Sequence, residues 1–378
     1  MKNQPSLQIR RGISTATQEH IAVAEIRRLI HQDQAQLILF FCSTAYDLAR
    51  LATELRNTFG DTPVIGCTTI GQLGLDGYTS GGISAISLAG DIAAHPFALD
   101  LAAMEGRVSG IADETKRIIG MHPDQRPFGL LLVDGLSLME EQLASLLYRR
   151  MPHLPIVGGS ASDNPSLQQT HVYVDGEFRT HTAVFTLFRT RLPFRTIKFA
   201  HFVPTDTTLV ITRSDQEKRV VYEINGEPAA QVYADLVGIP VEELGPPIFS
   251  INPLIFEMGG EQYIRAIASV NPDQSLTLYC IIENGMVLSI GRAVDPVANA
   301  LAAFDRLRED IGEPALVIGC DCLLRRLEFE GSGLLDAMGD IMKCNQVFGF
   351  STYGEQFDGL HMNQTFTGVA IGTGNALA

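Results

Sequence analysis

The sequence lacks tryptophan and holds only six cysteines among 378 residues. No two cysteines form a C-x-x-C pair, and the C-x-C at 320–322 has no second pair at zinc spacing. The pattern offers neither a zinc motif nor a disulfide framework. We therefore expect reduced, mostly buried thiols, as in a cytosolic protein. The cysteines are Cys42, Cys67, Cys280, Cys320, Cys322 and Cys344.

Positive charge is also scarce, with 28 Lys and Arg against 43 Asp and Glu, a formal net charge of −15. Binding to a phosphate backbone needs concentrated positive charge, so we expect no nucleic-acid partner. No uncharged apolar run reaches the about 18 residues expected of a membrane-spanning helix. No apolar segment follows the basic residues near the N-terminus, so we expect a cytoplasmic protein without a membrane partner.

Catalytic signatures are missing as well. The sequence has no G-x-x-x-x-G-K-[ST] loop, no G-x-S-x-G elbow and no H-E-x-x-H motif. Cys67 has no histidine near it in sequence that could activate it as a nucleophile. We therefore expect a protein that is not an enzyme. A hydrolase or transferase for a small amide or amino-acid-like substrate stays open, with carboxylates or nucleophiles from Cys67, Ser160, Asp163, Asp321 and Glu355.

One unit recurs three times along the chain. An apolar strand is followed by an amphipathic helix and by a second strand that ends in glycine and small polar residues. A further β-rich segment follows each unit, and a right-handed crossover should make the two strands of each unit parallel neighbours. The glycine-ended strands are VIGCTTIGQL at 64–73, IVGGSASDN at 156–164 and VFGFSTYGEQ at 347–356.

The segment from about 195 to 315 has a different pattern, with several strands joined by short turns. Glu283-Asn284-Gly285 between apolar runs predicts a hairpin with a type I′ turn. Helices are expected at 227–238, closed by Gly238, and at 295–312, opened by Asp295. Together these patterns predict an α/β fold. Its two lobes contain mixed sheets, built from repeated strand–helix–strand units with glycine-ended strands, and they meet near residues 200–220.

The glycine-ended strands also suggest where a ligand binds. In open α/β sheets, ligands lie outside the carboxyl ends of the strands, where small residues let them approach backbone N–H groups. Tight strand-to-loop turns are the alternative explanation of each cluster. Taken together, the three clusters predict a shared pocket formed by Gly66, Cys67, Thr68, Gly158, Gly159, Ser160, Asp163, Gly354, Glu355 and Asn363.

Two of the nine histidines stand in surroundings that suit a cofactor. His201 lies in the aromatic-rich run FRTIKFAHFVPT, and His361 follows the third glycine-ended strand. A histidine in such surroundings is usually a core residue with its hydrogen bonds satisfied. The functional alternative is an axial ligand to haem iron, which needs a neutral imidazole in an apolar pocket. Without a C-x-x-C-H motif, any haem would be held non-covalently.

Several of these motifs resemble the FIST family, a bacterial sensory module with an N-terminal and a C-terminal half. The resemblance rests on IGCTTIGQL, VGGSASDN, INGEPAAQVY, CDCLLRR and FGFSTYGEQFDGLHMNQT, and it covers the chain from about residue 25 onward. It implies an N-terminal lobe at 1–215 and a C-terminal lobe at 216–378. It also implies a ligand sensor in signal transduction.

One branch of the family consists of free-standing proteins that bind haem, sense nitric oxide and regulate a partner histidine kinase. The resemblance therefore implies haem as cofactor, with His201 or His361 as the iron ligand, and a histidine kinase as partner. A homodimer is also compatible with it. The alternative within the family is a sensor of another small molecule, such as an amino acid. In either case we expect ligand binding to favour one lobe arrangement, which the kinase would recognise.

Overall fold

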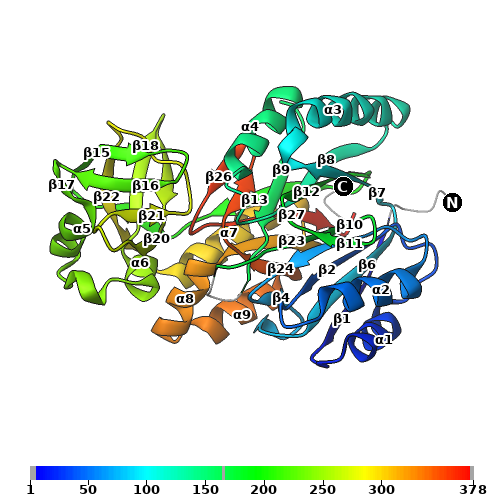
Figure 1. Ribbon diagram of the computed structural model, residues 1–378. Helices are drawn as coiled ribbons and strands as arrows, with labels where there is room; N and C mark the ends of the chain where they lie inside the picture. The colour runs from blue at the N-terminus through cyan, green and yellow to red at the C-terminus, as the bar shows by residue number, and fades with distance from the viewer. Residues whose placement is uncertain (1–5, 164–166, 375–378) are drawn as a thin grey trace.

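The computed structural model describes residues 6–163 and 167–374 and shows two lobes (Figure 1). The main lobe contains three mixed six-stranded sheets, and the small lobe is a nine-stranded antiparallel sheet formed by residues 202–293 with short helices beside it. The predicted fold class is confirmed. No helix of the described ranges has the length and apolar character needed to cross a membrane.

The main lobe repeats one arrangement of strands and helices three times. The first repeat comprises β1 (Leu7–Ser14), α1 (Glu19–Ile30), β2 (Leu37–Cys42), α2 (Leu48–Phe59), β3 (Val64–Thr68), β4 (Gln72–Gly74), β5 (Gly77–Thr79) and β6 (Ile83–Gly90). The second comprises β7 (Ala93–Asp100), the short η1 (Leu101–Ala103), α3 (Met104–Met121), β8 (Arg126–Val133), α4 (Glu140–Arg150), β9 (Ile156–Ser160), β10 (Val172–Val174), β11 (Glu177–Arg179) and β12 (Thr182–Thr190).

The third repeat is interrupted after its first strand by the whole small lobe. It comprises β13 (Phe194–Phe199), α7 (Pro296–Ile311), β23 (Pro314–Cys322), α8 (Leu323–Ser332), α9 (Leu335–Cys344), β24 (Val347–Thr352), β25 (Glu355–Phe357), β26 (Leu360–Met362) and β27 (Phe366–Gly372). The predicted boundary between residues 215 and 216 falls inside the small lobe, at the end of β15, so the lobes in space differ from the two halves in sequence.

The small lobe begins at β14 and ends at β22. Its elements are β14 (Phe202–Pro204), β15 (Leu209–Asp215), β16 (Val220–Ile224), β17 (Glu227–Pro228), α5 (Ala229–Val237), η2 (Val241–Glu243), α6 (Pro246–Ile251), β18 (Leu254–Met258), β19 (Glu261–Arg265), β20 (Ile267–Val270), β21 (Leu276–Leu278) and β22 (Val287–Ala293). Its apolar core contains Tyr233 and Phe249, which make an edge-to-face contact.

The predicted pairing of the repeated strands is confirmed. β2 with β3, β8 with β9 and β23 with β24 are parallel neighbours. The returning strands β6, β12 and β27 pair antiparallel on the other side of β2, β8 and β23. One apolar face of each sheet meets the other two in a shared core, where the rings of Phe41 and Phe350 stack with their centroids 4.3 Å apart.

The hairpin of each repeat completes the sheet of another repeat. β10 and β11 extend the first sheet beside β3, β25 and β26 extend the second beside β9, and β4 and β5 extend the third beside β24. Because each repeat gives its hairpin to another and receives one in return, the three repeats form a closed ring. The periodicity of apolar residues within a strand contains no information on this exchange between repeats.

Close strand approach explains a glycine that recurs at the same place in each repeat. A Cβ atom at Gly66, Gly158 or Gly349 would lie 2.3, 2.1 or 2.0 Å from a carbonyl oxygen of the neighbouring parallel strand. No ordinary side chain can be accommodated at such distances. These glycines therefore have a structural role in pairing β3, β9 and β24 with their neighbours.

Local signals placed two helices correctly and predicted one hairpin wrongly. Asp295 caps α7 by accepting from the N–H groups of Val297 and Ala298, and Gly238 ends α5 in the left-handed region, as predicted. The hairpin predicted at Glu283-Asn284-Gly285 is wrong. The Asn284 side chain instead accepts from the backbone N–H of Ser214 on β15, and the residues before the turn are not in a strand.

The glycine explanation predicts that Gly66→Ala destabilises the protein by about 3 kcal/mol, because the added methyl group overpacks β3 against Phe40. Gly106→Ala on α3 is the control, since nothing lies within 4 Å of its added Cβ. We expect the control to gain about 0.5–1 kcal/mol from helix propensity. Urea unfolding of both variants measures the difference, and equal stabilities would contradict the explanation.

Candidate ligand site at the lobe junction

Two adjacent strands connect the lobes. The chain enters the small lobe through β14 and leaves it through β22, and these strands pair antiparallel with Phe202 opposite Ala293. The N–H of Val294 donates to the carbonyl oxygen of His201 at 2.7 Å, so both crossing points lie side by side. These two paired strands are therefore the covalent connection between the lobes, and we call them the hinge.

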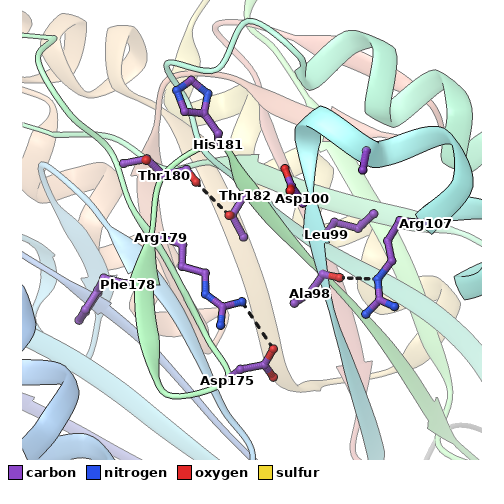
Figure 2. Close-up of a pocket in the computed structure, with 11 residues that line it drawn as sticks. Ala98, Leu99, Asp100, Arg107, Asp175, Phe178, Arg179, Thr180, His181 and Thr182 are labelled. Atoms are coloured by element: carbon purple, nitrogen blue, oxygen red, sulfur yellow. Dashed lines mark hydrogen bonds and ion pairs between the residues drawn. The ribbon is translucent and has the colours of Figure 1, made fainter.

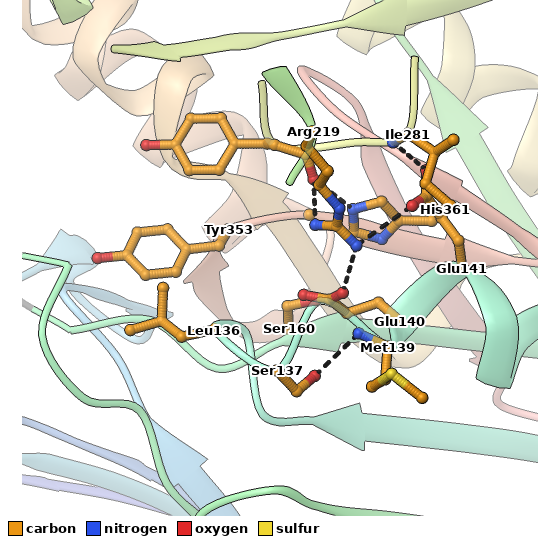
Figure 3. Close-up of polar contacts among 12 residues, drawn as sticks. Leu136, Ser137, Met139, Glu140, Glu141, Ser160, Arg219, Ile281, Tyr353 and His361 are labelled. Atoms are coloured by element: carbon orange, nitrogen blue, oxygen red, sulfur yellow. Dashed lines mark hydrogen bonds and ion pairs between the residues drawn. The ribbon is translucent and has the colours of Figure 1, made fainter. Parts of the chain in front are cut away.

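A buried ion pair joins the lobes beyond the hinge. Arg219 of the small lobe lies between β15 and β16, and its Nη2 is 2.7 Å from Glu140 Oε2 and 3.2 Å from Glu141 Oε2 (Figure 3). Arg219 Nη1 also donates to the carbonyl oxygen of Tyr279 at 2.7 Å. The side chains of Arg219 and Glu140 are only 3% and 2% exposed. Burial raises the pKa of Glu140 to about 7 despite this partner.

His361 lies beside this ion pair on β26 (Figure 3). Its Nδ1 is 3.1 Å from the side-chain nitrogen of Gln356, which donates, so Nδ1 is the acceptor. Its Nε2 is 3.3 Å from the carbonyl oxygen of Tyr279, which can only accept. The hydrogen therefore sits on Nε2. Burial lowers the pKa of His361 to about 3, so the ring is neutral at physiological pH.

His201 stands in the hinge itself and is also fully engaged. Its Nε2 is 2.8 Å from both carboxylate oxygens of Glu328, and its Nδ1 is 2.9 Å from Arg325 Nη1. Arg325 Nε donates to Asp321 at 2.7 Å, and the hydroxyl of Tyr78 donates to the same carboxylate at 2.6 Å. Polar contacts thus run from the hinge to the hairpin that the first repeat contributes to the third sheet.

The strand ends predicted to form a pocket do meet in the structure. Ser160 N–H donates to the Gly354 carbonyl oxygen at 2.8 Å, and Glu355 lies opposite Gly159 in the strand pairing. Thr68 joins the group through its carbonyl oxygen, which accepts from the N–H of Ser162 at 3.1 Å. Backbone hydrogen bonds therefore hold these strand ends directly against one another.

The other predicted pocket residues take different positions. Asp163 accepts from the hydroxyl of Tyr353 and from two backbone N–H groups, and the side-chain nitrogen of Asn363 donates to the Tyr353 carbonyl oxygen at 3.3 Å. Cys67 faces the shared apolar core, where burial raises the pKa of its thiol well above the usual value. Gly66 and Gly158 serve strand pairing, as described above.

Three side-chain oxygens at the junction are buried and accept no hydrogen bond from the residues that the structure describes: Gln356 Oε1, Asn363 Oδ1 and Gln364 Oε1. Buried polar atoms of this kind are uncommon in proteins and point to a partner such as a ligand or a bound water. A Cβ added at Gly354 would lie 2.2 Å from His361 Cε1 and 3.1 Å from the Asn363 side-chain nitrogen. The amides of Gln356 and Asn363 therefore lie beside His361 and Gly354, whereas the Gln364 amide donates to the Ser250 carbonyl oxygen of the small lobe.

Glu355 is buried on the other side of the same hairpin. Its carboxyl accepts from the hydroxyl of Thr352 and from both the N–H and the hydroxyl of Thr365, the last at 2.8 Å. Burial raises its pKa to about 8, so the group carries a proton at neutral pH. It is therefore a neutral hydrogen-bonding group in the wall of the site.

The fold and the junction together define a two-lobed α/β protein with a hinge and a buried polar site between its lobes. The chain belongs to the FIST family, since residues 36–227 match the FIST N domain and residues 229–358 match the FIST C domain. This family comprises sensor domains that bind small ligands in signal transduction. The predicted family is thereby confirmed.

One curated relative is also similar to this chain. The uncharacterized protein MJ1623 of Methanocaldococcus jannaschii is 23% identical over 299 residues, which cover 68% of this chain and 57% of that protein. The matched part of the chain thus spans little more than half the length of this relative.

Sequence reasoning missed several residues of the junction. Arg219 and Glu140 are 79 positions apart, and nothing in their local sequence couples them. The amides of Gln356 and Gln364 stand within a motif that carries the family resemblance, but local sequence does not show that both are buried. His201 and His361 both lie at the junction, each with hydrogen-bond partners on its ring nitrogens.

The pKa of Glu355 is about 8 in the folded protein, whereas the ordinary pKa of a glutamate is 4.5. Between these pH values the folded state binds a proton that the unfolded state does not, so protons favour folding. The free energy of unfolding should therefore fall as the pH rises from about 4.5 to 8. Glu355→Gln should remove up to about 1.4 kcal/mol per pH unit of this slope. Urea unfolding across that pH range measures it. Glu105→Gln, at an exposed position on α3, should retain the wild-type slope.

Removing Arg219 leaves Glu140 buried without its partner, so Arg219→Met should destabilise the protein by about 3–5 kcal/mol. Arg213→Met is the matched control, because Arg213 is 59% exposed and pairs with Glu223 at the surface of the same lobe. The control should lose less than about 1 kcal/mol. Chemical denaturation compares the two, and losses of equal size would show that the junction pair does not stabilise the fold.

Proposed function

We propose that the protein is a sensor whose small-molecule ligand binds at the lobe junction and changes the orientation of the small lobe, and that a partner histidine kinase recognises this change. The observation that carries the proposal is the set of three buried, unpartnered amide oxygens beside an interlobe ion pair, among the residues described. The two-stranded hinge supplies the movable element. No catalytic step is part of this function.

The junction is suited to a change between two arrangements. Burying the charges of Arg219 and Glu140 costs desolvation energy that their attraction offsets only when the geometry is good. A ligand that offers its own charged groups can therefore replace the pair at modest cost. By linkage, a ligand that binds one lobe arrangement more tightly shifts the population toward it.

The chemistry of the site favours a small zwitterion, such as an amino acid. An ammonium group can donate to the free oxygens of Gln356, Asn363 and Gln364 or to the carboxylates of Glu140 and Glu141. A carboxylate group can accept from the guanidinium of Arg219. Both signs of charge are thus available within one buried site.

The alternative proposal for this sensor is that its ligand is haem, with His201 or His361 as the ligand of the iron. In this conformation the residues do not fit that role, because both ring nitrogens of each histidine are engaged by protein groups. Binding through either ring would first require breaking those contacts. We therefore derive no step through haem or nitric oxide.

The haem version has a direct test in the absorption spectrum of the protein after reconstitution with haem. The observed contacts predict that any Soret band is unchanged in His201→Ala and His361→Ala. A band that disappears in one of these variants, while the variant stays folded by circular dichroism, would establish that histidine as the iron ligand and support nitric oxide sensing.

The zwitterion version predicts that at least one common amino acid raises the melting temperature of the full chain and that Asn363→Ala reduces the affinity about tenfold or more, by loss of a buried hydrogen bond. Calorimetric titration measures this. Asn299→Ala is the matched control, because its side-chain oxygen is also buried without a described partner but lies on α7, which packs on β13. Affinity that is equal in both variants, or no response to any amino acid, would contradict this version.

A further inference from the structure

A polar pocket that is open to solvent lies in the main lobe, at the end of the second sheet away from the lobe junction. It has a volume of about 400 Å³ and lies between the β6–β7 turn, the α3–β8 loop and the end of β12. Thr190 at the end of β12 lies opposite Arg126, the first residue of β8. The other end of β8 leads toward α4 and Glu140, so the pocket and the lobe junction lie at opposite ends of this strand. Its polar lining includes Gln36, Asp91, His122, Gln125, Arg189 and Arg191.

Arg189 is the central feature of this cavity. Although it carries a permanent positive charge, it is only 4% exposed. Its Nη1 donates to Gln125 Oε1 at 2.5 Å, its Nη2 lies 3.1 Å from His95 Nε2, and its Nε has no partner among the described residues. Because a guanidinium only donates, His95 Nε2 must be the acceptor and is therefore unprotonated. Neither contact supplies a negative charge.

The carboxylates around Arg189 do not neutralise it. Within the described ranges no carboxylate oxygen lies within the 4.0 Å ion-pair distance of its guanidinium. Asp91 is paired with Arg191, whose Nε is 2.9 Å away, and Asp124 is an exposed residue that acts on Arg189 from farther off. Burial lowers the pKa of Arg189 and also that of His95, so both groups experience a poorly solvated environment. Asp91 is thus already matched by the half-exposed Arg191, and the buried positive charge of Arg189 has no carboxylate partner among the described residues.

The other two repeats show that the fold does not require an arginine here. The strand pairings align the returning strands of the three repeats with one another. Their matching positions are Phe185 opposite Leu131, Ala85 opposite Phe40 and Gly368 opposite Gly319. Four residues farther along these strands, the positions that match Arg189 are Ala89 and Gly372. A buried, unpaired charge normally costs several kcal/mol, and two repeats avoid that cost with small uncharged residues.

We propose that this cavity is an anion-binding site for a small organic ligand with a carboxylate or phosphate group, which supplies the counter-charge of Arg189. The volume falls within the range of about 300–1,000 Å³ that is usual for small-molecule pockets. The Arg189 Nε–H donates to no described residue, and the Gln36 and Gln125 side chains add neutral polar groups to the wall. This site is separate from the lobe junction and does not depend on the function proposed there.

A larger groove of about 670 Å³ serves as a contrast (Figure 2). It also contains two arginines, but Arg179 pairs with Asp175 and Glu177, and Arg107 is exposed and donates to the Ala98 carbonyl oxygen at 3.0 Å. Charges that reach water or carry a partner need no ligand to stabilise them. The groove therefore lacks the feature that marks the Arg189 cavity.

The test is the melting temperature of the full chain in sodium phosphate and in sodium acetate, each compared with sodium chloride at equal ionic strength. We expect phosphate, acetate or both to raise the melting temperature of the wild type by at least about 2 °C, because an anion bound only to the folded state stabilises it. Comparing the two salts shows whether the site prefers phosphate or carboxylate chemistry.

Three variants locate the effect. Arg189→Met should lose the anion-dependent rise and, in chloride, should melt at or above the wild-type temperature, because it removes an uncompensated buried charge. Arg179→Gln in the larger groove and Asn363→Ala at the lobe junction should both keep the rise. The second of these also separates this proposal from the junction ligand.

Three results would overturn the proposal. The first is a wild type that melts at the same temperature in all three salts. The second is an Arg189→Met variant that retains the anion-dependent rise, which would show that the anions act elsewhere. The third is an Arg189→Met variant that melts well below the wild type in chloride or fails to fold, which would show that Arg189 stabilises the fold.

Discussion

The close approach of two parallel strands within each repeat is the constraint on which the rest of the structure depends. Gly66, Gly158 and Gly349 allow this approach, since a Cβ at any of them would collide with a carbonyl oxygen. The strands then end together, so the small polar residues that follow them meet at one place. The exchange of hairpins among the three repeats closes the ring and fixes that meeting point.

The small lobe makes one of the three repeats different from the others. It is inserted between β13 and α7 and rests against the hairpin of β25 and β26 through Arg219, Tyr279 and His361. The ring and the insertion are thus two bodies joined by two paired strands. The proposed sensor depends on a change in their relative position when a ligand binds between them.

The sequence predicted the elements better than their assembly. Apolar periodicity located the strand–helix–strand units, and Asp295 and Gly238 marked helix ends because capping is a local property. The hairpin exchange could not be predicted, since β10 pairs with β3 across about a hundred residues for reasons of register and packing. The prediction from Glu283-Asn284-Gly285 was wrong because Asn284 binds the backbone of β15 instead of forming a hairpin turn.

The contacts among some candidate site residues also follow from strand order. Ser160, Gly354 and Glu355 do meet, because strand ends in one layer converge. The ion pair of Arg219 with Glu140 joins residues whose proximity depends on how the small lobe sits on the ring, and local sequence contains no signal for it. Likewise, Arg189 is unremarkable in sequence, and only its burial without a carboxylate partner distinguishes it.

The central claim is that a ligand at the junction changes the orientation of the small lobe. It is tested most directly by the distance between spin labels at Met258 in the small lobe and Met121 on α3, both exposed. Replacing Cys344 with serine leaves only buried native cysteines, so the labels attach at the two introduced sites. The account predicts that an amino acid that raises the melting temperature also shifts the distance distribution, and that Asn363→Ala abolishes the shift. A stabilising ligand that needs Asn363 yet leaves the distribution unchanged would contradict the account.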